Sequence, residues 1–122
     1  MSILTELNTL MEQVGLPVQT GAFLEEAPFE YVVLVSIIDS YDLWADDWPL
    51  YDIQEARISL YSKGNFQQRR HQIERMLLAQ DFNIDERRYI GREDDTGYHH
   101  YVIDVEKAYR FREEEEPWQP SV

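Results

Sequence analysis

The fold is decided by one stretch, which reads Arg57-Ile58-Ser59-Leu60-Tyr61 and leads almost directly into residues 65–80. Successive strand residues point to opposite faces, so Ile58 and Leu60 share one side of a sheet. The period then changes, because the next segment carries an apolar stripe at helical spacing: Phe66, Ile73, Met76, Leu77 and Leu78. The pattern predicts a strand followed by a helix that packs back on the sheet.

The segments before this unit predict a helix and a buried strand. Ser2 is suited to cap a first helix, and Gly15 with Pro17 is suited to end it. Residues 31–38 are rich in β-branched side chains and are apolar at odd and even positions alike. That pattern is typical of a central strand covered on both faces. Residues 39–49 then break the pattern and are expected to form a loop.

Three more strands complete the expected sheet, at about residues 51–61, 87–92 and 98–111. Residues 94–97 read as the hairpin turn between the last two, with Gly97 free to adopt a positive φ. We therefore predict an α+β fold with a mostly antiparallel sheet of about four strands and two helices packed on it. The expected order is α-β-β-α-β-β.

The 122 residues indicate one domain, placed at residues 1–112. Residues 113–122 combine four glutamates with two prolines, which predicts an acidic and mobile C-terminal tail. The chain has no cysteine, which excludes disulfides and thiolate metal sites. We see no secretion signal, and the longest apolar run is far shorter than the roughly 20 residues that span a bilayer.

The charge balance narrows the range of partners. Asp and Glu total 24 against 11 Lys and Arg, which gives a formal net charge of −13. Such a chain repels phosphate backbones and anionic lipid surfaces, so we expect neither nucleic-acid nor membrane binding. High negative charge also keeps a protein soluble, and that simpler role is sufficient to explain it.

Residues 39–49 hold two large aromatics, Trp44 and Trp48, among aspartates that include Asp46 and Asp47. The indoles either fold onto the core or are presented to a partner, and the sequence leaves both open. A calcium loop needs oxygen ligands at set spacings and a glycine at the sharp turn, which this segment lacks. We interpret the aspartates as a solvated loop.

The histidines suggest no shared site. His99 and His100 are neighbours on a predicted strand and point to opposite faces. His71 stands alone on the second helix and is expected to be exposed. We find no nucleophile elbow and no phosphate loop, and therefore predict no catalytic residues and no cofactor.

Positive charge gathers on the second helix at Arg69, Arg70 and Arg75. A basic patch opposite acidic loops favours head-to-tail pairing of copies, which closes into a ring when the rotation allows. The candidate interface residues are Trp44, Trp48, Arg69, Arg70, Arg75, Asp46 and Asp47.

The order of elements resembles the small tail proteins of long-tailed bacteriophages and prophages, including tail terminator (tail completion) proteins. The resemblance covers about residues 3–106 and consists of spaced aliphatics and tyrosines. It is carried by Val14-Gly15-Leu16-Pro17-Val18, Phe29-Glu30-Tyr31-Val32-Val33, Tyr51, the strand at residues 57–63, Ile73-Glu74-Arg75-Met76-Leu77, Tyr89-Ile90, Glu93 and Tyr98-His99-His100-Tyr101.

The resemblance implies a non-enzymatic assembly protein. Tail terminators are similar small α+β subunits that form a ring, commonly a hexamer, which caps the tail tube and joins it to the head connector. The implied partners are other copies of the chain, the tube protein and the connector protein. The implied location is the host cytoplasm during assembly and then the virion tail.

Two rival functions compete with this interpretation. An acidic inhibitor or DNA mimic would use its carboxylates to imitate phosphates, with Asp42, Asp46, Asp47, Asp94 and Asp95 as candidates. It would be a monomer or dimer that binds a basic partner in a salt-sensitive way. An enzyme with a carboxylate-rich metal site would instead bind magnesium, manganese or calcium, which calorimetry would detect.

Overall fold

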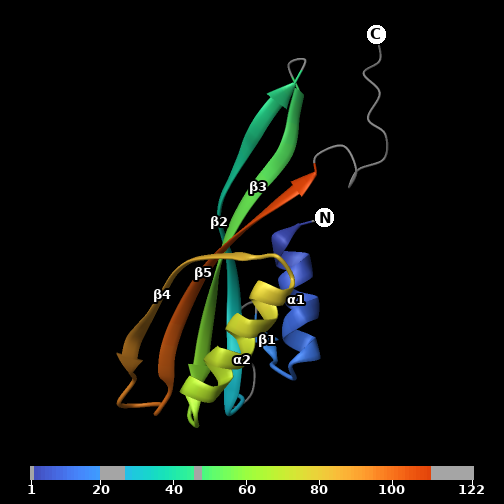
Figure 1. The fold of residues 1–122 in the computed structure, drawn as a ribbon. Coiled ribbons are helices and arrows are strands. Elements are labelled where there is room, and N and C mark those ends of the chain that lie inside the picture. The colour runs from blue at the N-terminus through green and yellow to red at the C-terminus, as the bar shows by residue number, and fades with distance from the viewer. Residues whose placement is uncertain (1, 20–26, 46–47, 111–122) are drawn as a thin grey trace.

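The computed structural model describes residues 2–19, 27–45 and 48–110, without the side chains of residues 42–45, 48 and 49. It has an α+β fold in which two helices cover one face of a five-stranded sheet (Figure 1). The elements are α1 (Ile3–Gln13), β1 (Val18–Gln19), β2 (Glu30–Ala45), β3 (Trp48–Ser62), α2 (Phe66–Ala79), β4 (Asn83–Arg92) and β5 (His99–Arg110). The predicted α+β class is confirmed.

The sheet differs from the expectation by one strand. Its order is β1-β2-β3-β5-β4, and β1 runs parallel to β2 while the other neighbours are antiparallel. The extra strand pairs only Val18 and Gln19 with β2, which is too short to produce a periodic pattern in the sequence. The sheet is therefore mixed, and the order is α-β-β-β-α-β-β.

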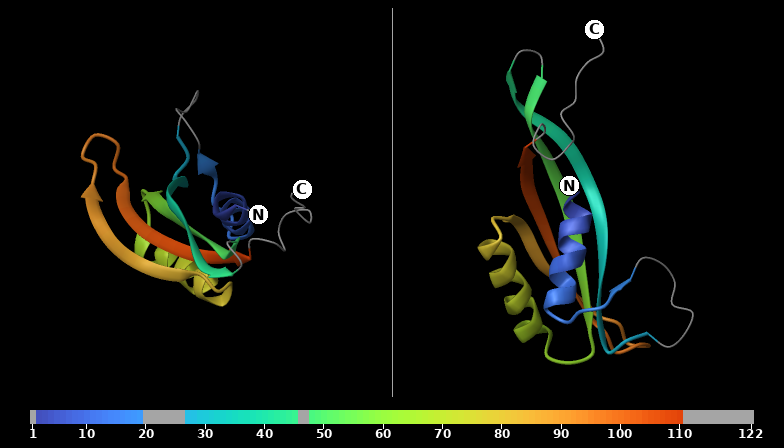
Figure 2. Two further views of the ribbon diagram at one scale, coloured as in Figure 1. Left: turned by 90° about the horizontal axis from the view of Figure 1, so that it is seen from above. Right: turned by 90° about the vertical axis from the view of Figure 1, so that its right-hand side faces the viewer.

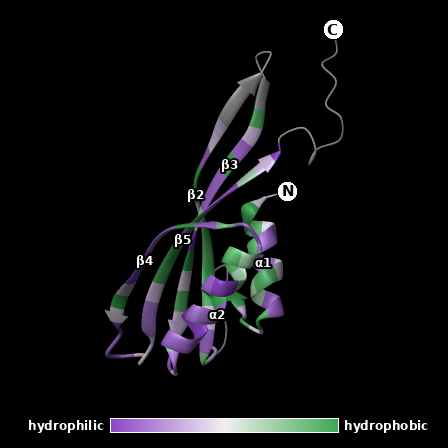
Figure 3. Cartoon of the chain, in the orientation of Figure 1, coloured by the Kyte–Doolittle hydropathy of each residue, from purple (hydrophilic) through white to green (hydrophobic). Residues whose placement is uncertain are grey.

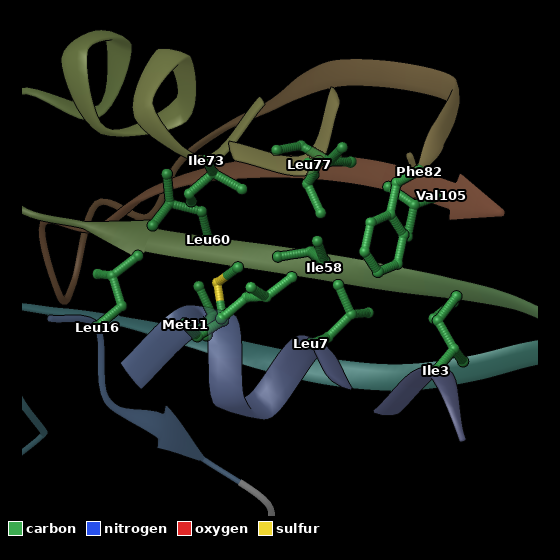
Figure 4. Packing of buried hydrophobic residues seen from close by; sticks show 14 of the residues in the cluster. Ile3, Leu7, Met11, Leu16, Ile58, Leu60, Ile73, Leu77, Phe82 and Val105 are labelled. Carbon is green, nitrogen blue, oxygen red and sulfur yellow. The ribbon is translucent and has the colours of Figure 1, made fainter. Parts of the chain in front are cut away.

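The core lies between the sheet and the two helices, which stand on the same side of it (Figure 2). Ile58 and Leu60 of β3 are fully buried, as their alternation predicts. Side chains from both helices point toward them, including Leu7 of α1 and Leu77 of α2 (Figure 4). Each buried side chain of this size stabilises the fold by about 1.5–3 kcal/mol relative to exposure.

Hydropathy alternates along both helices and the strands behind them (Figure 3). On α2, Ile73 and Leu77 are buried, whereas Leu78 is 60% exposed and was wrongly assigned to the buried stripe. Consecutive helical residues are about 100° apart, so Leu78 points away when Leu77 faces the core.

The helix ends follow the predicted signals. Ser2 Oγ accepts a hydrogen bond from the Thr5 amide at 3.1 Å, and Gly15 has a φ of +79° just after the C-cap Val14. The hydrogen bond and the positive φ confirm the predicted cap and stop of α1. At the other end of the chain, Gly97 has a φ of +83° in the predicted hairpin turn, and its amide donates to Glu93.

Residues 39–45 and 48–49 lie in strands, so the expectation of a loop is wrong for them. β2 and β3 pair from Glu30↔Ser62 to Ala45↔Trp48, and their hairpin extends beyond the helices (Figures 1 and 2). The aspartates suggested a loop because Asp is rare in strands, but a long antiparallel ladder overrides such local preferences. The side chains of Trp44 and Trp48, and residues 46–47 entirely, lie outside the described part, as does the predicted tail at 113–122.

The expectation that residues 31–38 are covered on both faces is also wrong. Val32 is fully buried, but Val35, Ile37 and Ile38 are about half exposed. A β-bulge between Ser36 and Ile38 shifts the register of β2 against β3. Apolar residues at odd and even positions therefore occur here in a strand that is only partly covered. Whether such a strand is buried on both faces depends on the elements that pack against it.

Candidate functional site

The helix-free face of the sheet carries an aromatic cluster formed by Tyr31, Tyr61, Tyr98 and His100. The rings of Tyr31 and Tyr61 stack with centroids 4.9 Å apart, and His100 stacks on Tyr61 at 4.3 Å. Tyr98 meets Tyr31 edge-on and donates a hydrogen bond to the Pro28 carbonyl. Burial raises the pKa of the Tyr31 and Tyr61 hydroxyls, so both are neutral near pH 7.

His100 is the least satisfied member of this cluster. Its Nε2 is the one buried side-chain nitrogen or oxygen without a hydrogen-bond partner in the part of the chain that the structure describes. Burial lowers the pKa of His100, with the nearby Glu93 charge opposing the shift. A ring stacked on Tyr61 is suited to packing, and among the described residues no group hydrogen-bonds Nε2 to exchange a proton with it.

His99 lies on the other face, as its position next to His100 on a strand predicts. Its ring stacks on Phe66 at 4.9 Å, and its Nδ1 is 2.8 Å from the Tyr89 hydroxyl. His71 is exposed on α2, as predicted.

Three carboxylates meet on the helix-free face, which the sequence did not indicate. Oxygens of Glu55, Asp85 and Glu106 lie within 4.8 Å of one another. Glu55 and Glu106 are directly opposite on paired strands, and Asp85 joins them from the bulge between Ile84 and Glu86. Only the strand register and this bulge bring them together, so no spacing in the sequence could have revealed the carboxylate cluster.

The electrostatics of this carboxylate cluster are unfavourable when all three groups are ionised. Burial, followed by the charge of Glu55, raises the pKa of Asp85. Burial, followed by a hydrogen bond with Glu55, raises the pKa of Glu106. Carboxylate oxygens are suitable ligands for hard divalent cations, which prefer six or more oxygens. Exposed acidic groups also gather without an ion, so the cluster alone does not define a metal site.

Two of the three predicted interface arginines form ion pairs with carboxylates of their own chain. Arg69 pairs with Glu30 at 2.9 Å and also donates to the Val14 carbonyl. Arg70 pairs with the buried Glu74 at 3.2 Å. Arg75 is exposed, and no ion pair to it occurs among the described side chains. The second helix therefore presents less free positive charge than its sequence suggests.

A shallow cavity of about 310 Å³ lies beside Arg69 where β2 begins. Its described lining is mainly amide and charged side chains: Phe29, Glu30, Asn65, Gln68, Arg69 and Gln72. The charged pair in it is already satisfied by its own hydrogen bonds, so the cavity offers no activated nucleophile or base.

Exposed apolar side chains occur instead mainly on β2, which β1 covers only at Val32 and Val33, and on the edge strand β4. Of the nine large hydrophobic side chains that are exposed in the described ranges, four lie on β2 and two on β4. Those on β2 are Val35, Ile37, Ile38 and Tyr41, and those on β4 are Tyr89 and Ile90. The sequence missed this surface because exposure at these positions depends on sheet order and on bulges.

No protein-family model matches the sequence, and no curated protein matches it. No described helix has the length and apolar character needed to cross a bilayer.

Proposed function

We propose that the protein is a non-enzymatic structural subunit of a phage or prophage tail, of the kind that terminates the tail tube and joins it to the head connector. The observation that carries this proposal is the exposed apolar surface on β2 and β4. Edge strands of stable monomers are normally protected by charge, proline or cover, and apolar side chains there mark a surface that a partner covers.

The polar groups support an assembly role as well. Glu74 is held by two arginines, and Glu6 is held by Lys107 at 2.7 Å and by the Tyr109 hydroxyl at 2.8 Å. These charged groups stabilise the fold through internal pairs. They are not aimed at a common reacting atom, which is the arrangement that catalysis requires.

Net charge supports the placement in a tail. At −13, a ring of such subunits repels DNA, so DNA can pass through its opening without binding to the wall. The proposed partners are copies of this chain, the tube protein and the head connector, met first in the host cytoplasm and then in the virion tail.

Tube growth provides the direct test. The purified protein is added to polymerising tube protein from the same genome, and tube lengths are measured by negative-stain imaging. We expect shorter tubes with a ring-shaped density at one end. An unchanged length distribution with bare ends would refute the proposal.

The acidic-inhibitor alternative makes a different prediction from the same preparation. Its specific support is the cluster of Glu55, Asp85 and Glu106, which concentrates negative charge on the helix-free face. Light scattering would then give a monomer or dimer, and affinity for a basic partner would fall steeply with salt.

A further inference from the structure

The helix-free face of the sheet carries exposed apolar side chains beside the carboxylate cluster. Ile38 of β2 lies directly opposite Glu55 of β3, and Glu55 lies opposite Glu106 of β5. Residues directly opposite on antiparallel strands share a face, so Ile38 borders the cluster. Ile38 is 55% exposed, and its neighbours Val35 and Ile37 are about half exposed. Because both described helices stand on the other side of the sheet, this surface has no helical cover from them (Figure 2).

The described part of the chain supplies no cation to the carboxylate cluster. None of the ion pairs between described side chains includes Glu55, Asp85 or Glu106. Arg57 stands two residues from Glu55 on β3, but its guanidinium donates two hydrogen bonds to Asp104, at 2.8 and 3.0 Å. When ionised, three carboxylates within 4.8 Å of one another repel, and a positive charge from outside the chain would relieve that repulsion.

The exposed side of α2 has the opposite character. The one carboxylate of this helix, Glu74, is buried, whereas His71, Arg75 and the 60% exposed Leu78 face solvent. Arg75 forms no ion pair with any described side chain. A shallow hollow of about 370 Å³ lies beside it, lined by two glutamines together with His71 and Arg75. The helix therefore presents a free positive charge and an uncovered apolar group on a chain of net charge −13.

The spacing of these groups matches between the two surfaces. Arg75 and Leu78 are three residues apart on a helix, which makes their side chains neighbours at about 5–6 Å between Cβ atoms. Ile38 and Glu55 are directly opposite on antiparallel strands, where Cβ atoms lie about 4.5–5.5 Å apart. One helix can therefore place Leu78 on Ile38 and Arg75 near Glu55 at the same time.

We propose that the exposed side of α2 in one copy docks on the helix-free face of the next copy, with Leu78 on Ile38 and Arg75 at the carboxylate cluster. The interface is heterologous, because each copy contributes its helix to one neighbour and its sheet to the other. This inference rests on the proposed ring-forming function and names its contact surface. Of the three arginines on α2 it uses Arg75 alone, since Arg69 and Arg70 are bound within their own chain.

Three substitutions of one kind test the docking. Leu78→Asp alters the helix surface, Ile38→Asp alters the sheet surface, and Ile90→Asp is the matched control. The three positions are 60%, 55% and 48% exposed, and each change adds one negative charge. Ile90 lies on β4 next to the residue paired with His100, far along the strands from the carboxylate cluster. Because all three side chains are exposed, thermal melts should stay close to that of the parent chain.

Light scattering of the full chain should show an oligomer larger than a dimer for the parent and for Ile90→Asp. Leu78→Asp and Ile38→Asp should each be monomeric at the same concentration. A 1:1 mixture of these two variants should form a heterodimer and nothing larger, because only one intact helix surface and one intact sheet surface remain to meet. That result separates the heterologous interface from any self-complementary one.

The charged contact has its own test. Arg75→Gln should raise the dissociation constant between copies by roughly tenfold, because it removes the cation that meets the carboxylates. Assembly of the parent should weaken as salt rises, and this dependence should be smaller in the variant. Arg88→Gln is the control, since Arg88 is also exposed, forms no ion pair with a described side chain, and lies opposite Val102, four residues from Glu106. An Arg75→Gln variant with the affinity of the parent would overturn the proposed docking.

Three further results would overturn it: a parent chain that stays monomeric at high concentration, Leu78→Asp or Ile38→Asp variants that assemble like Ile90→Asp, or a mixture with no heterodimer. The tube-length measurement is independent of these. Variants that remain oligomeric while the parent still ends tube growth would remove the docking and leave the tail function standing. Assembly that follows the docking pattern without any effect on tubes would do the reverse.

Discussion

The two faces of the sheet treat charge and apolar surface in opposite ways. On the helix-covered face, Glu74 binds Arg70 and Arg87, and Glu6 binds Lys107. On the helix-free face, the pair of Arg57 and Asp104 is satisfied, but the carboxylate cluster is crowded and His100 has an unpartnered nitrogen. The comparison indicates that the covered face stabilises the subunit, whereas the helix-free face and the edges retain features that a lone subunit does not need.

The largest expected effect comes from shortening an apolar side chain on the helix-covered face, compared with the same change on the helix-free face. Leu60→Ala deletes a fully buried side chain facing both helices and should lower the free energy of unfolding by about 2–5 kcal/mol. Ile38→Ala, at a position 55% exposed, should cost less than about 1 kcal/mol. Urea denaturation of the two variants at low protein concentration measures both values. Equal losses would mean that the helix-free face is part of the core.

The second effect compares the ion pairs of the buried Glu74 with the partly exposed pair of Arg57 and Asp104. Glu74 is 5% exposed and holds Arg70 and Arg87, so Glu74→Gln should destabilise the protein by about 1–3 kcal/mol. Asp104→Asn breaks the bidentate pair with the partly exposed Arg57 on the other face and should cost less than about 1 kcal/mol. Chemical denaturation gives both numbers. A larger loss for Asp104→Asn would reverse the assignment of stability to the covered face.

The contrast between covered and uncovered parts of the sheet also explains which elements could be predicted from the sequence and which could not. The strand at 57–61 and the helix at 65–80 were predicted correctly, because burial on one face leaves a regular apolar period. Residues 31–38 were misjudged, because apolar residues on an uncovered edge look the same as residues buried on both sides. Composition also predicted a loop where residues 39–45 and 48–49 belong to the paired strands β2 and β3.

The candidate surfaces were even less accessible to sequence reasoning. Glu55, Asp85 and Glu106 are far apart in the chain and meet only through strand register and a bulge, and neither is encoded by local spacing. Arg69 and Arg70 were recognised as a basic cluster, but their partners Glu30 and Glu74 depend on packing. The sequence therefore shows which charged side chains are present, but it does not show which of them are left free to bind a partner.

The third effect is a gain in stability on the helix-free face. Glu106→Gln should stabilise the protein at pH 7 by about 0.5–1 kcal/mol, because it removes one of two like charges opposite each other on paired strands. Glu12→Gln on the exposed side of α1 is the control and should change little. Thermal unfolding at fixed ionic strength measures the difference, and a destabilised Glu106→Gln would show that the carboxylate makes a favourable contact.

The pH dependence of this gain follows from the direction of the pKa shift. The fold raises the pKa of Glu106 above its ordinary value of 4.5, so the folded state holds that proton more tightly than the unfolded state. The wild-type contribution is therefore present below pH 4.5 and is lost as the pH rises through the raised folded value. The advantage of Glu106→Gln should accordingly shrink as the pH falls toward 4.5.

The smallest effect concerns His100, and its pH dependence has the opposite sign. Burial lowers its pKa below the ordinary value of 6.5, so the folded state binds that proton less tightly than the unfolded state. Wild-type stability should rise from the lowered folded value up to pH 6.5 and then level off. His100→Phe keeps the stack on Tyr61 but cannot take up a proton, so that part of the rise should disappear.

The comparison for His100 is made at pH 5 and pH 7 by chemical denaturation, with the exposed His71→Gln as the control. The expected difference between His100→Phe and the parent is a few tenths of a kcal/mol, because solvent near the sheet surface screens the buried ring. An unchanged pH slope in His100→Phe would mean that the imidazole is protonated as easily in the fold as outside it. The aromatic cluster would then be open to water, and the helix-free face would be more weakly packed than its ring geometry indicates.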